Sequence, residues 1–267
     1  MSRPRIMGVI NVTPDSFSDG GTYLHTAPDL ARIAGDARAM LENGADVLDV
    51  GGESTRPGSE GVAEDEELRR VMPVLEELLE LDAIISLDTR KPAVAARALA
   101  AGVHLINDVS GGREPGMLEA VAGSTAGYCV MHMQGEPRTM QEAPRYHDVV
   151  AEVGAYLAER VAACRGAGID DGRLLLDPGF GFGKTLEHNL ALLRRLDALR
   201  VDGLPLLAGL SRKGMIGAIT GRELAARTAG SVAAALLAVQ RGADVVRVHD
   251  VAETADALKM LGAVTAG

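Results

Sequence analysis

Eight short apolar runs alternate with eight longer helix-like stretches, and this alternation limits the possible folds more than any other feature of the chain. The apolar runs are Ile6–Asn11, Val47–Val50, Ile84–Asp88, Leu105–Val109, Tyr128–His132, Leu174–Asp177, Leu206–Leu210 and Val245–His249. They are short and often β-branched, as strands buried on both faces are. Strands separated by helices pair in parallel through right-handed crossovers. Eight such units in 267 residues predict an α/β fold, a single (β/α)8 barrel domain over residues 1–267.

The stretches between these runs carry the periodicity and the end signals of helices. The helix candidates are Asp29–Asn43, Glu64–Leu81, Pro92–Ala101, Gly116–Ala122, Val149–Ala167, Leu186–Leu199, Thr228–Arg241 and Val251–Val264. An open, doubly wound sheet is the alternative architecture. It would usually have fewer strands and a glycine-rich phosphate loop after the first one. The segment after the first run reads NVTPDSFSDGG, which is not such a loop, so the barrel is favoured.

Composition excludes several classes of protein. The formal net charge of -10 argues against a general nucleic-acid surface. The N-terminus lacks the pattern of a signal peptide, and no run approaches the roughly 18 apolar residues of a membrane helix. The two cysteines, Cys129 and Cys164, lie in apolar runs and are interpreted as buried thiols in a reducing compartment. We therefore expect a cytoplasmic protein without a nucleic-acid or membrane partner.

The segment from Leu174 to Thr185 reads LLLDPGFGFGKT and ends like a nucleotide-binding P-loop. The P-loop pattern is G-x-x-x-x-G-K-[ST], so a second glycine must stand five residues before the glycine that precedes the lysine. That position is Pro178, which has no amide to donate to a phosphate. The dinucleotide pattern fails as well, because Lys184 stands where its last glycine should be. The carboxylate of Asp177, at the end of an apolar run, is the more informative residue.

Polar residues stand at the carboxyl end of nearly every expected strand. They are Asn11, Asp49, Asp88, Asn107, His132, Asp177, Ser211-Arg212-Lys213, Arg247 and His249. The apolar residue Met131 precedes His132 at the same end of its strand. Any one of them could close a strand or begin a loop. So many at one rim indicate a site, because buried charge is costly unless it is paired or used. Barrel active sites lie at this rim.

The set divides into two kinds of chemistry. The acceptors Asp49, Asp88, Asn107 and Asp177, with Lys213 nearby, suit a flat heterocycle rich in N–H groups, since two parallel donors match one carboxylate. The cations Arg56, Arg247 and His249 suit a diphosphate, and Asn11 could offer a metal an oxygen. His132 could simply close its strand and is left out of the predicted site. No zinc-like spacing and no pair of nucleophile and base stand out.

At this level of detail the chain resembles the dihydropteroate synthases of folate biosynthesis. The resemblance rests on GVINVTPDSFSDGG, DVGGESTRPG, INDVSG, VMHMQGEPRTMQ, LLLDPGFGFGK, GLSRKGMIG and RVHDV, in this order over nearly the whole chain. It implies that 6-hydroxymethyl-7,8-dihydropterin diphosphate reacts with 4-aminobenzoate to give 7,8-dihydropteroate and diphosphate, with Mg2+. It also implies a sulfonamide target and, as is common in the family, a homodimer formed through the late helices.

The resemblance assigns roles residue by residue. Asp88, Asn107, Asp177 and Lys213 would hold the pterin, and Asn11, Arg247 and His249 would hold the diphosphate and Mg2+. Asp49, Met131 and Ser211 are further predicted substrate-binding residues. Thr55 and Arg56 belong to the second substrate loop, while Asp15 and Asp19 belong to the first. Phe17, Pro57, Phe182 and Lys213 would shape the aminobenzoate pocket. Asp88, Lys213, Arg247 and His249 are the residues predicted to carry catalysis.

One departure from the family pattern concerns the second substrate. Many relatives read SRKS where this chain has Ser211-Arg212-Lys213-Gly214, so Gly214 lacks a hydroxyl that would face the aminobenzoate carboxylate. We expect modestly weaker aminobenzoate binding than with serine.

The alternatives to a synthase are a methyltetrahydrofolate:corrinoid methyltransferase and a non-catalytic pterin-binding barrel. A methyltransferase would not need the diphosphate cations or the ESTRPG loop, and a binding module would have lost some of them. A general phosphosugar enzyme would not explain the deep carboxylates.

Overall fold

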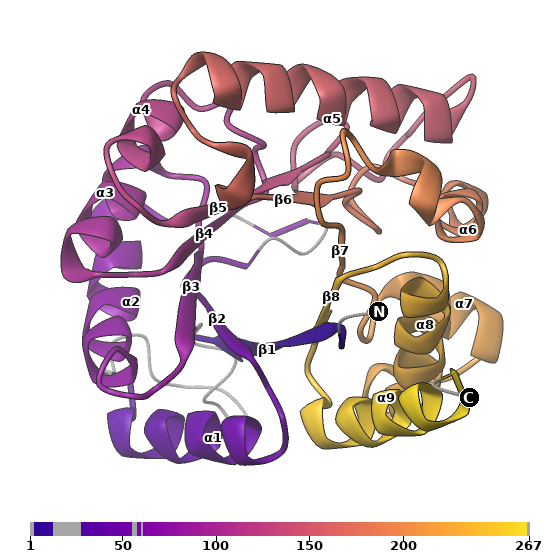
Figure 1. The fold of residues 1–267 in the computed structure, drawn as a ribbon, viewed down its shortest axis with the longest axis horizontal. Coiled ribbons are helices and arrows are strands. Elements are labelled where there is room, and N and C mark those ends of the chain that lie inside the picture. The colour runs from indigo at the N-terminus through magenta and orange to yellow at the C-terminus, as the bar shows by residue number, and fades with distance from the viewer. Residues whose placement is uncertain (1–2, 13–27, 55–57, 60, 266–267) are drawn as a thin grey trace.

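The computed structural model describes residues 3–12, 28–54, 58–59 and 61–265. Its eight strands are β1 (Arg5–Asn11), β2 (Val47–Gly51), β3 (Ile84–Asp88), β4 (Leu105–Asp108), β5 (Gly127–Met131), β6 (Leu174–Asp177), β7 (Leu207–Ala208) and β8 (Val245–Val248). All pairs are parallel, in the order β6-β5-β4-β3-β2-β1-β8-β7. A bridge between Leu176 and Leu206 joins the two outermost strands, so the sheet closes nearly into a barrel (Figure 1). The predicted (β/α)8 fold is confirmed.

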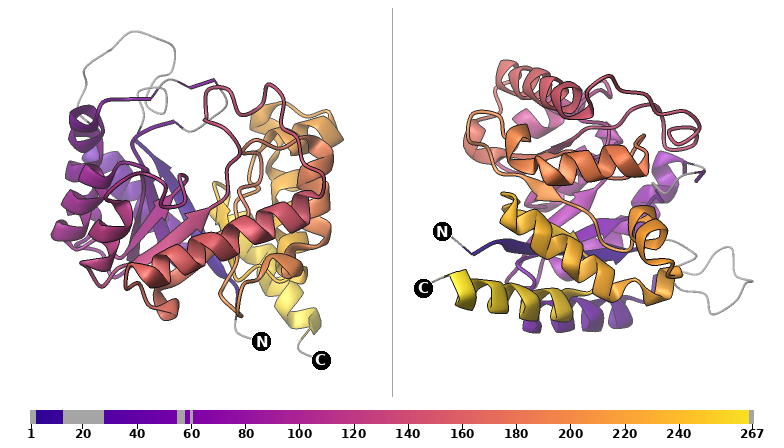
Figure 2. Two further views of the ribbon diagram at one scale, coloured as in Figure 1. Left: turned by 90° about the horizontal axis from the view of Figure 1, so that it is seen from above. Right: turned by 90° about the vertical axis from the view of Figure 1, so that its right-hand side faces the viewer.

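Helices surround the barrel on the outside (Figure 1). Within the described residues they are α1 (Leu30–Glu42), α2 (Glu64–Leu78), α3 (Pro92–Ala101), α4 (Met117–Ala122), α5 (Val149–Gly166), α6 (Leu186–Arg194), α7 (Gly214–Thr220), α8 (Thr228–Gln240) and α9 (Val251–Thr265). Because each helix runs back from the rim, the first strand begins and the last helix ends at the same end of the barrel (Figure 2).

The sequence prediction missed one helix, and its bounds differ most from the structure in two further elements. Helix α7, GMIGAIT, contains two glycines and two isoleucines. Glycine is a poor helix former and isoleucine an average one, so the local sequence does not predict a helix there. The expected helix Leu186–Leu199 is divided, with a 3₁₀ turn over Leu196–Leu199. Strand β7 has two residues, between Pro205, which cannot donate to a ladder, and Gly209. No helix of the described chain is long and apolar enough to cross a membrane.

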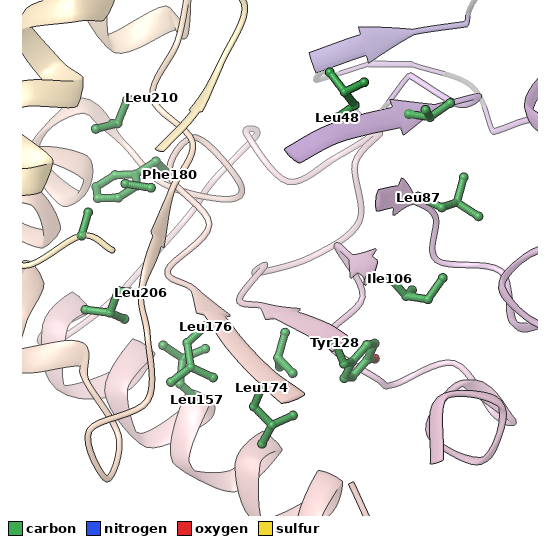
Figure 3. Close-up of a cluster of buried hydrophobic side chains, with 14 of the residues drawn as sticks. Leu48, Leu87, Ile106, Tyr128, Leu157, Leu174, Leu176, Phe180, Leu206 and Leu210 are labelled. Carbon is green, nitrogen blue, oxygen red and sulfur yellow. The ribbon is translucent and has the colours of Figure 1, made fainter. Parts of the chain in front are cut away.

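The larger apolar core lies between the strands and the helices. Leu48, Leu87, Ile106, Tyr128 and Leu176 point outward from successive strands into this layer, together with Leu157 of α5 (Figure 3). Each of these side chains is fully buried. Burial of such residues stabilises each by about 1.5–3 kcal/mol, so this layer fixes where the strand ends lie.

A separate apolar cluster fills the inside of the barrel. It contains Met7, Val47, Leu105, Cys129, Leu175 and Leu207, with Val245 packed against it. These side chains come from seven different strands, as the stacked layers of a barrel interior do. The cluster therefore blocks the barrel below its carboxyl rim.

Candidate active site

A polar layer lies directly above this apolar cluster. Asp49, Asn107, Asp177 and Arg247 each follow a member of the cluster by two residues on β2, β4, β6 and β8. Side chains two apart on a strand face the same side, so the strands themselves bring these polar groups together. Parallel strands all end at one rim, and that rim is where the sequence predicts the site.

Asp49 is completely buried and accepts hydrogen bonds from three other residues of the site. Its Oδ1 accepts from Ser86 Oγ at 2.5 Å. Its Oδ2 accepts from Asn107 Nδ2 at 3.0 Å and from Arg247 Nε at 2.6 Å. These donors occupy most of its acceptor capacity, so in this structure Asp49 holds Asn107 and Arg247 in place.

Arg247 serves a second carboxylate as well. Its Nη2 donates to Asp88 Oδ2 at 2.8 Å, so one guanidinium pairs with both Asp49 and Asp88. Burial raises the pKa of Asp88 to about 7, with the neighbouring Asp49 carboxylate adding to the rise and Arg247 opposing it. Two carboxylates with one cation leave a net negative charge that can receive N–H donors.

Asp177 and Lys213 form the other half of the layer. Asp177 Oδ1 accepts from the Gly179 amide at 2.7 Å, and burial raises the pKa of this carboxyl while Lys213 lowers it. Burial lowers the pKa of Lys213 to about 8, and Asp177 opposes that shift. Lys213 Nζ donates to the Phe180 carbonyl and lies 4.7 Å from the centre of the Phe182 ring. The predicted neighbours are therefore brought together.

The Phe182 ring belongs to an apolar wall beside these charges. It packs against a cluster of Val109, Met131, Met133 and Met140, so the predicted residue Met131 contributes to the wall. A wall of thioethers and a phenyl ring suits a flat aromatic ligand.

The remaining described residues of the prediction lie at the ends of β1, β7 and β8. Ser211 Oγ is 3.0 Å from His249 Nδ1 and accepts from the His249 amide at 3.2 Å. Asn11 is exposed at the end of β1. Its Oδ1 and Asp88 Oδ2 would each lie 3.9 Å from a Cβ placed on Gly51, so the amide oxygen of Asn11 lies near the carboxylates.

Several predicted residues lie outside the described residues: Phe17, Thr55, Arg56 and Pro57, together with Asp15 and Asp19. The segment that contains Thr55 to Pro57 is flanked by described residues that contact one another. Glu53 accepts from the Val62 amide at 3.0 Å and from Lys91 Nζ, which also pairs with the buried Glu67.

Sequence reasoning missed Ser86 and gave no role to Lys184. A signal for Ser86 was available, because it is a polar residue inside an apolar run, two residues before Asp88. Lys184 follows a run of glycines, and no periodicity shows that its side chain is buried, with 3% of its surface exposed. His132, which was left out of the site, contacts Lys184 rather than the polar layer.

A surface groove of about 490 Å³ lies elsewhere, between α3, α4 and the loops that precede β4 and β5. It is lined mostly by alanine and glycine, and none of the predicted site residues lines it. Two of its polar side chains are already bonded, since His104 Nδ1 accepts from the Ile85 amide and Ser124 Oγ donates to Val121 O. We therefore place the site at the polar layer.

Comparison with known proteins identifies the family of the chain. The model of the pterin binding enzyme family matches residues 7–249. Dihydropteroate synthase of Escherichia coli K12 is 50% identical over 264 residues, which cover 98% of this chain and 92% of that protein.

Two solved structures share the fold over nearly the whole chain. The dihydropteroate synthase of Yersinia pestis, solved with a sulfonamide drug complex, has a TM-score of 0.93 at 47% identity and covers 99% of this chain and 95% of its own. That of Burkholderia cenocepacia, complexed with 7,8-dihydropteroate, has a TM-score of 0.89 at 49% identity and covers 99% and 92%. The chain belongs to the dihydropteroate synthase family of pterin binding enzymes.

Proposed function

We infer that the chain catalyses the dihydropteroate synthase reaction, in which 4-aminobenzoate displaces diphosphate from 6-hydroxymethyl-7,8-dihydropterin diphosphate. Family membership supports this reaction over the methyltransferase and the non-catalytic barrel. The observation that carries the proposal is the buried polar layer, in which Asp49 and Asp88 share the guanidinium of Arg247 beside Asp177 and Lys213.

The pterin would bind against the carboxylates of this layer. Asp177 lies at the end of β6 with one oxygen bonded to the Gly179 amide, which leaves acceptor capacity for the two parallel N–H donors of an aminopyrimidinone edge. Asn107 is held by Asp49, so its amide is oriented before substrate arrives. Lys213, whose pKa is lowered to about 8 by burial, would donate to a pterin acceptor.

The diphosphate would lie above the pterin, between the ends of β1 and β8. Arg247 carries permanent charge, and His249 would add a donor next to it. Neutralising the developing charge makes diphosphate a better leaving group. The electron-rich dihydropterin can stabilise positive charge at its exocyclic methylene, and the weakly basic arylamine then attacks. The enzyme's task toward the amine is positioning, which the Phe182 wall and Lys213 would provide.

We propose that Mg2+ assists through Asn11. The described residues contain no cluster of three or more histidine, cysteine or acidic side chains that could hold a metal. Mg2+ is usually held by one or two protein oxygens, with waters and substrate phosphates completing its shell. The exposed amide oxygen of Asn11 near Asp88 fits this pattern. When bound, the ion would neutralise charge on the diphosphate. Calorimetric binding of diphosphate should require Mg2+ in the wild type and lose that dependence in Asn11→Ala.

The test of the function is diphosphate release from the dihydropterin substrate with and without 4-aminobenzoate. Release that requires the arylamine and matches dihydropteroate formation one to one supports the proposal. Binding of the pterin without turnover would contradict it and favour a binding module. Asp177→Asn should abolish pterin binding, while Asp171→Asn, which removes an exposed carboxylate bonded to Arg165, is the matched control and should leave turnover unchanged.

We further propose a cytoplasmic homodimer that sulfonamides inhibit. Exposed apolar side chains on the late helices support the dimer: Ile219, Leu237, Met260 and Val264, of α7, α8 and α9. The two buried free thiols are compatible with a reducing compartment. Sedimentation equilibrium should give twice the chain mass, and Leu237→Glu should give a monomer. Competition between a sulfonamide and 4-aminobenzoate in the synthase assay tests the inhibition.

A further inference from the structure

The glycine-rich loop after β6, residues 179–183, has every one of its carbonyl groups bonded to a side chain. Most loop carbonyls bond to backbone or to water, and side-chain donors usually reach a few of them. Here the donors come from the loop's own next residue and from two other loops. The pairs are Gly179 O and Phe182 O with Lys184 Nζ, Phe180 O with Lys213 Nζ, Gly181 O with Gln141 Nε2, and Gly183 O with Tyr146 Oη.

Lys184 is the internal member of this set of donors. Its Nζ lies 2.9 Å from Gly179 O, 3.0 Å from Phe182 O and 2.9 Å from His132 Nδ1. A longer contact of 3.3 Å joins the same Nζ to His132 O. An ammonium group has three N–H donors, so these four acceptors occupy all of them. Lys184 therefore connects the loop after β6 to His132, the residue that directly follows β5.

The glycines of the loop allow this close approach. A Cβ on Gly179 would lie 1.9 Å from His132 O, and one on Gly183 would lie 2.3 Å from Gln134 O, both at positive φ. The two loop backbones are therefore in direct contact, and the Lys184 side chain fills the space that remains between them. The arrangement is rigid, because the amides of Gly179, Gly181 and Phe182 are bonded as well.

The lysine is almost completely buried, which separates it from an ordinary loop lysine. Burial lowers the pKa of Lys184 well below its usual range, and the carboxylate of Asp177 opposes this shift. Burial likewise lowers the pKa of His132 to about 3, so this ring is neutral and its Nδ1 can accept from Lys184. Burying an ammonium group costs free energy. Here the buried group contacts the backbone carbonyl of Phe182.

We propose that Lys184 is a positioning residue for the second substrate, acting through the loop that carries Phe182. This inference rests on the proposed function, because Phe182 and Lys213 would form the aminobenzoate side of the site. Lys184 holds the Phe182 carbonyl from one side of the loop, and Lys213 lies over the Phe182 ring on the other side. Asp177 is held mainly by its place in β6, although its Oδ1 also accepts from the Gly179 amide, so we expect a smaller effect on the pterin than on the second substrate.

The consequence is a selective effect on one substrate. Lys184→Met keeps the length of the side chain and removes the donors. We expect the KM for 4-aminobenzoate to rise about tenfold or more and the KM for the dihydropterin diphosphate to change by less than about threefold. Arg173→Met is the matched control, because Arg173 also holds two carbonyls, Ala126 O and Val121 O, at the opposite end of the barrel. It should leave both KM values unchanged.

Amide hydrogen exchange gives a second readout that does not need activity. In Lys184→Met the bonded amides of Gly179, Gly181 and Phe182 should exchange about 100-fold faster than in the wild type, while Arg173→Met should leave them protected. A chain that makes no dihydropteroate would refute the proposed function, and the exchange measurement would still decide on the role of Lys184 in the loop.

A milder variant guards against loss of folding. Tyr146→Phe removes one hydroxyl and one donor, to Gly183 O at 2.9 Å, and should raise the KM for 4-aminobenzoate about threefold with little change for the pterin. Equal changes in the two KM values would overturn the proposal. Unchanged exchange of the bonded amides of the loop in both Lys184→Met and Tyr146→Phe would overturn it as well.

Discussion

Replacing Asp88 by asparagine should make the protein more stable at alkaline pH while removing its activity. Asp88 and Asp49 share one guanidinium, so removing one negative charge leaves a balanced pair of Arg247 and Asp49. The asparagine oxygen can still accept the N–H that Arg247 donates to Asp88 at 2.8 Å. The variant therefore loses a charge without leaving the Arg247 donor unpaired.

The size of the effect follows from the pKa of Asp88, which rises from 3.8 to about 7. Between these values the folded chain holds a proton that the unfolded chain has released, so the free energy of unfolding falls as pH rises through this window. One pKa unit corresponds to about 1.4 kcal/mol, so the cost reaches at most about 4 kcal/mol above pH 7. The value of about 7 already includes the attraction of Arg247. Because an asparagine amide does not reproduce every contact of a protonated carboxyl group, we expect Asp88→Asn to gain about 1–3 kcal/mol at pH 8 and almost nothing at pH 4.

Thermal unfolding of both proteins at pH 4, 6 and 8 measures this difference. A gain of 1 kcal/mol raises the Tm of a domain of this size by about 2–4 °C. Asp171→Asn is the control with the opposite sign, because the hydrogen bond from Arg165 lowers the pKa of Asp171. An Asp88→Asn protein that is less stable than the wild type at pH 8, or whose advantage does not grow with pH, would refute the reasoning.

Three further predictions concern the same rim. Arg247→Met should lower the free energy of unfolding by about 3 kcal/mol or more, since two buried carboxylates lose their cation, and chemical denaturation measures this loss. Gly214→Ser should lower the KM for 4-aminobenzoate about two- to fivefold, because a Cβ at Gly214 meets nothing within 4 Å; an unchanged or higher KM contradicts it. The kcat/KM for 4-aminobenzoate should fall above pH 8 as Lys213 loses its proton, and Lys213→Arg should move that fall to higher pH.

The barrel and most of its polar layer could be predicted from sequence because both depend on local patterns. Strands Ile84–Asp88 and Leu174–Asp177 have the predicted bounds, since each apolar run ends at a carboxylate. The two-residue spacing of Arg247 and His249 places them together at the end of one strand. Helix α7 was missed because its stability comes from packing of Met215 and Ile216, which local propensity does not report.

The partners of the site residues could not be predicted, because they depend on which side chains meet in space. Asp49 was expected to bind substrate, yet it accepts from Ser86, Asn107 and Arg247. The contact of Lys184 with His132 joins residues 52 positions apart, and no spacing rule connects them. Burial and long-range hydrogen bonding are therefore the information that the structure adds.

The apolar cluster inside the barrel, made by Met7, Val47, Leu105, Cys129, Leu175 and Leu207, has a consequence for the order of events in turnover. Because it closes the barrel from below, the rim is both the entrance and the exit. In the proposed binding mode the pterin lies deepest, against Asp177, so it must enter before the second substrate covers it. Diphosphate would then leave from the upper part of the site. Dihydropteroate, with its pterin end deepest, would leave last, through the same rim by which the substrates entered.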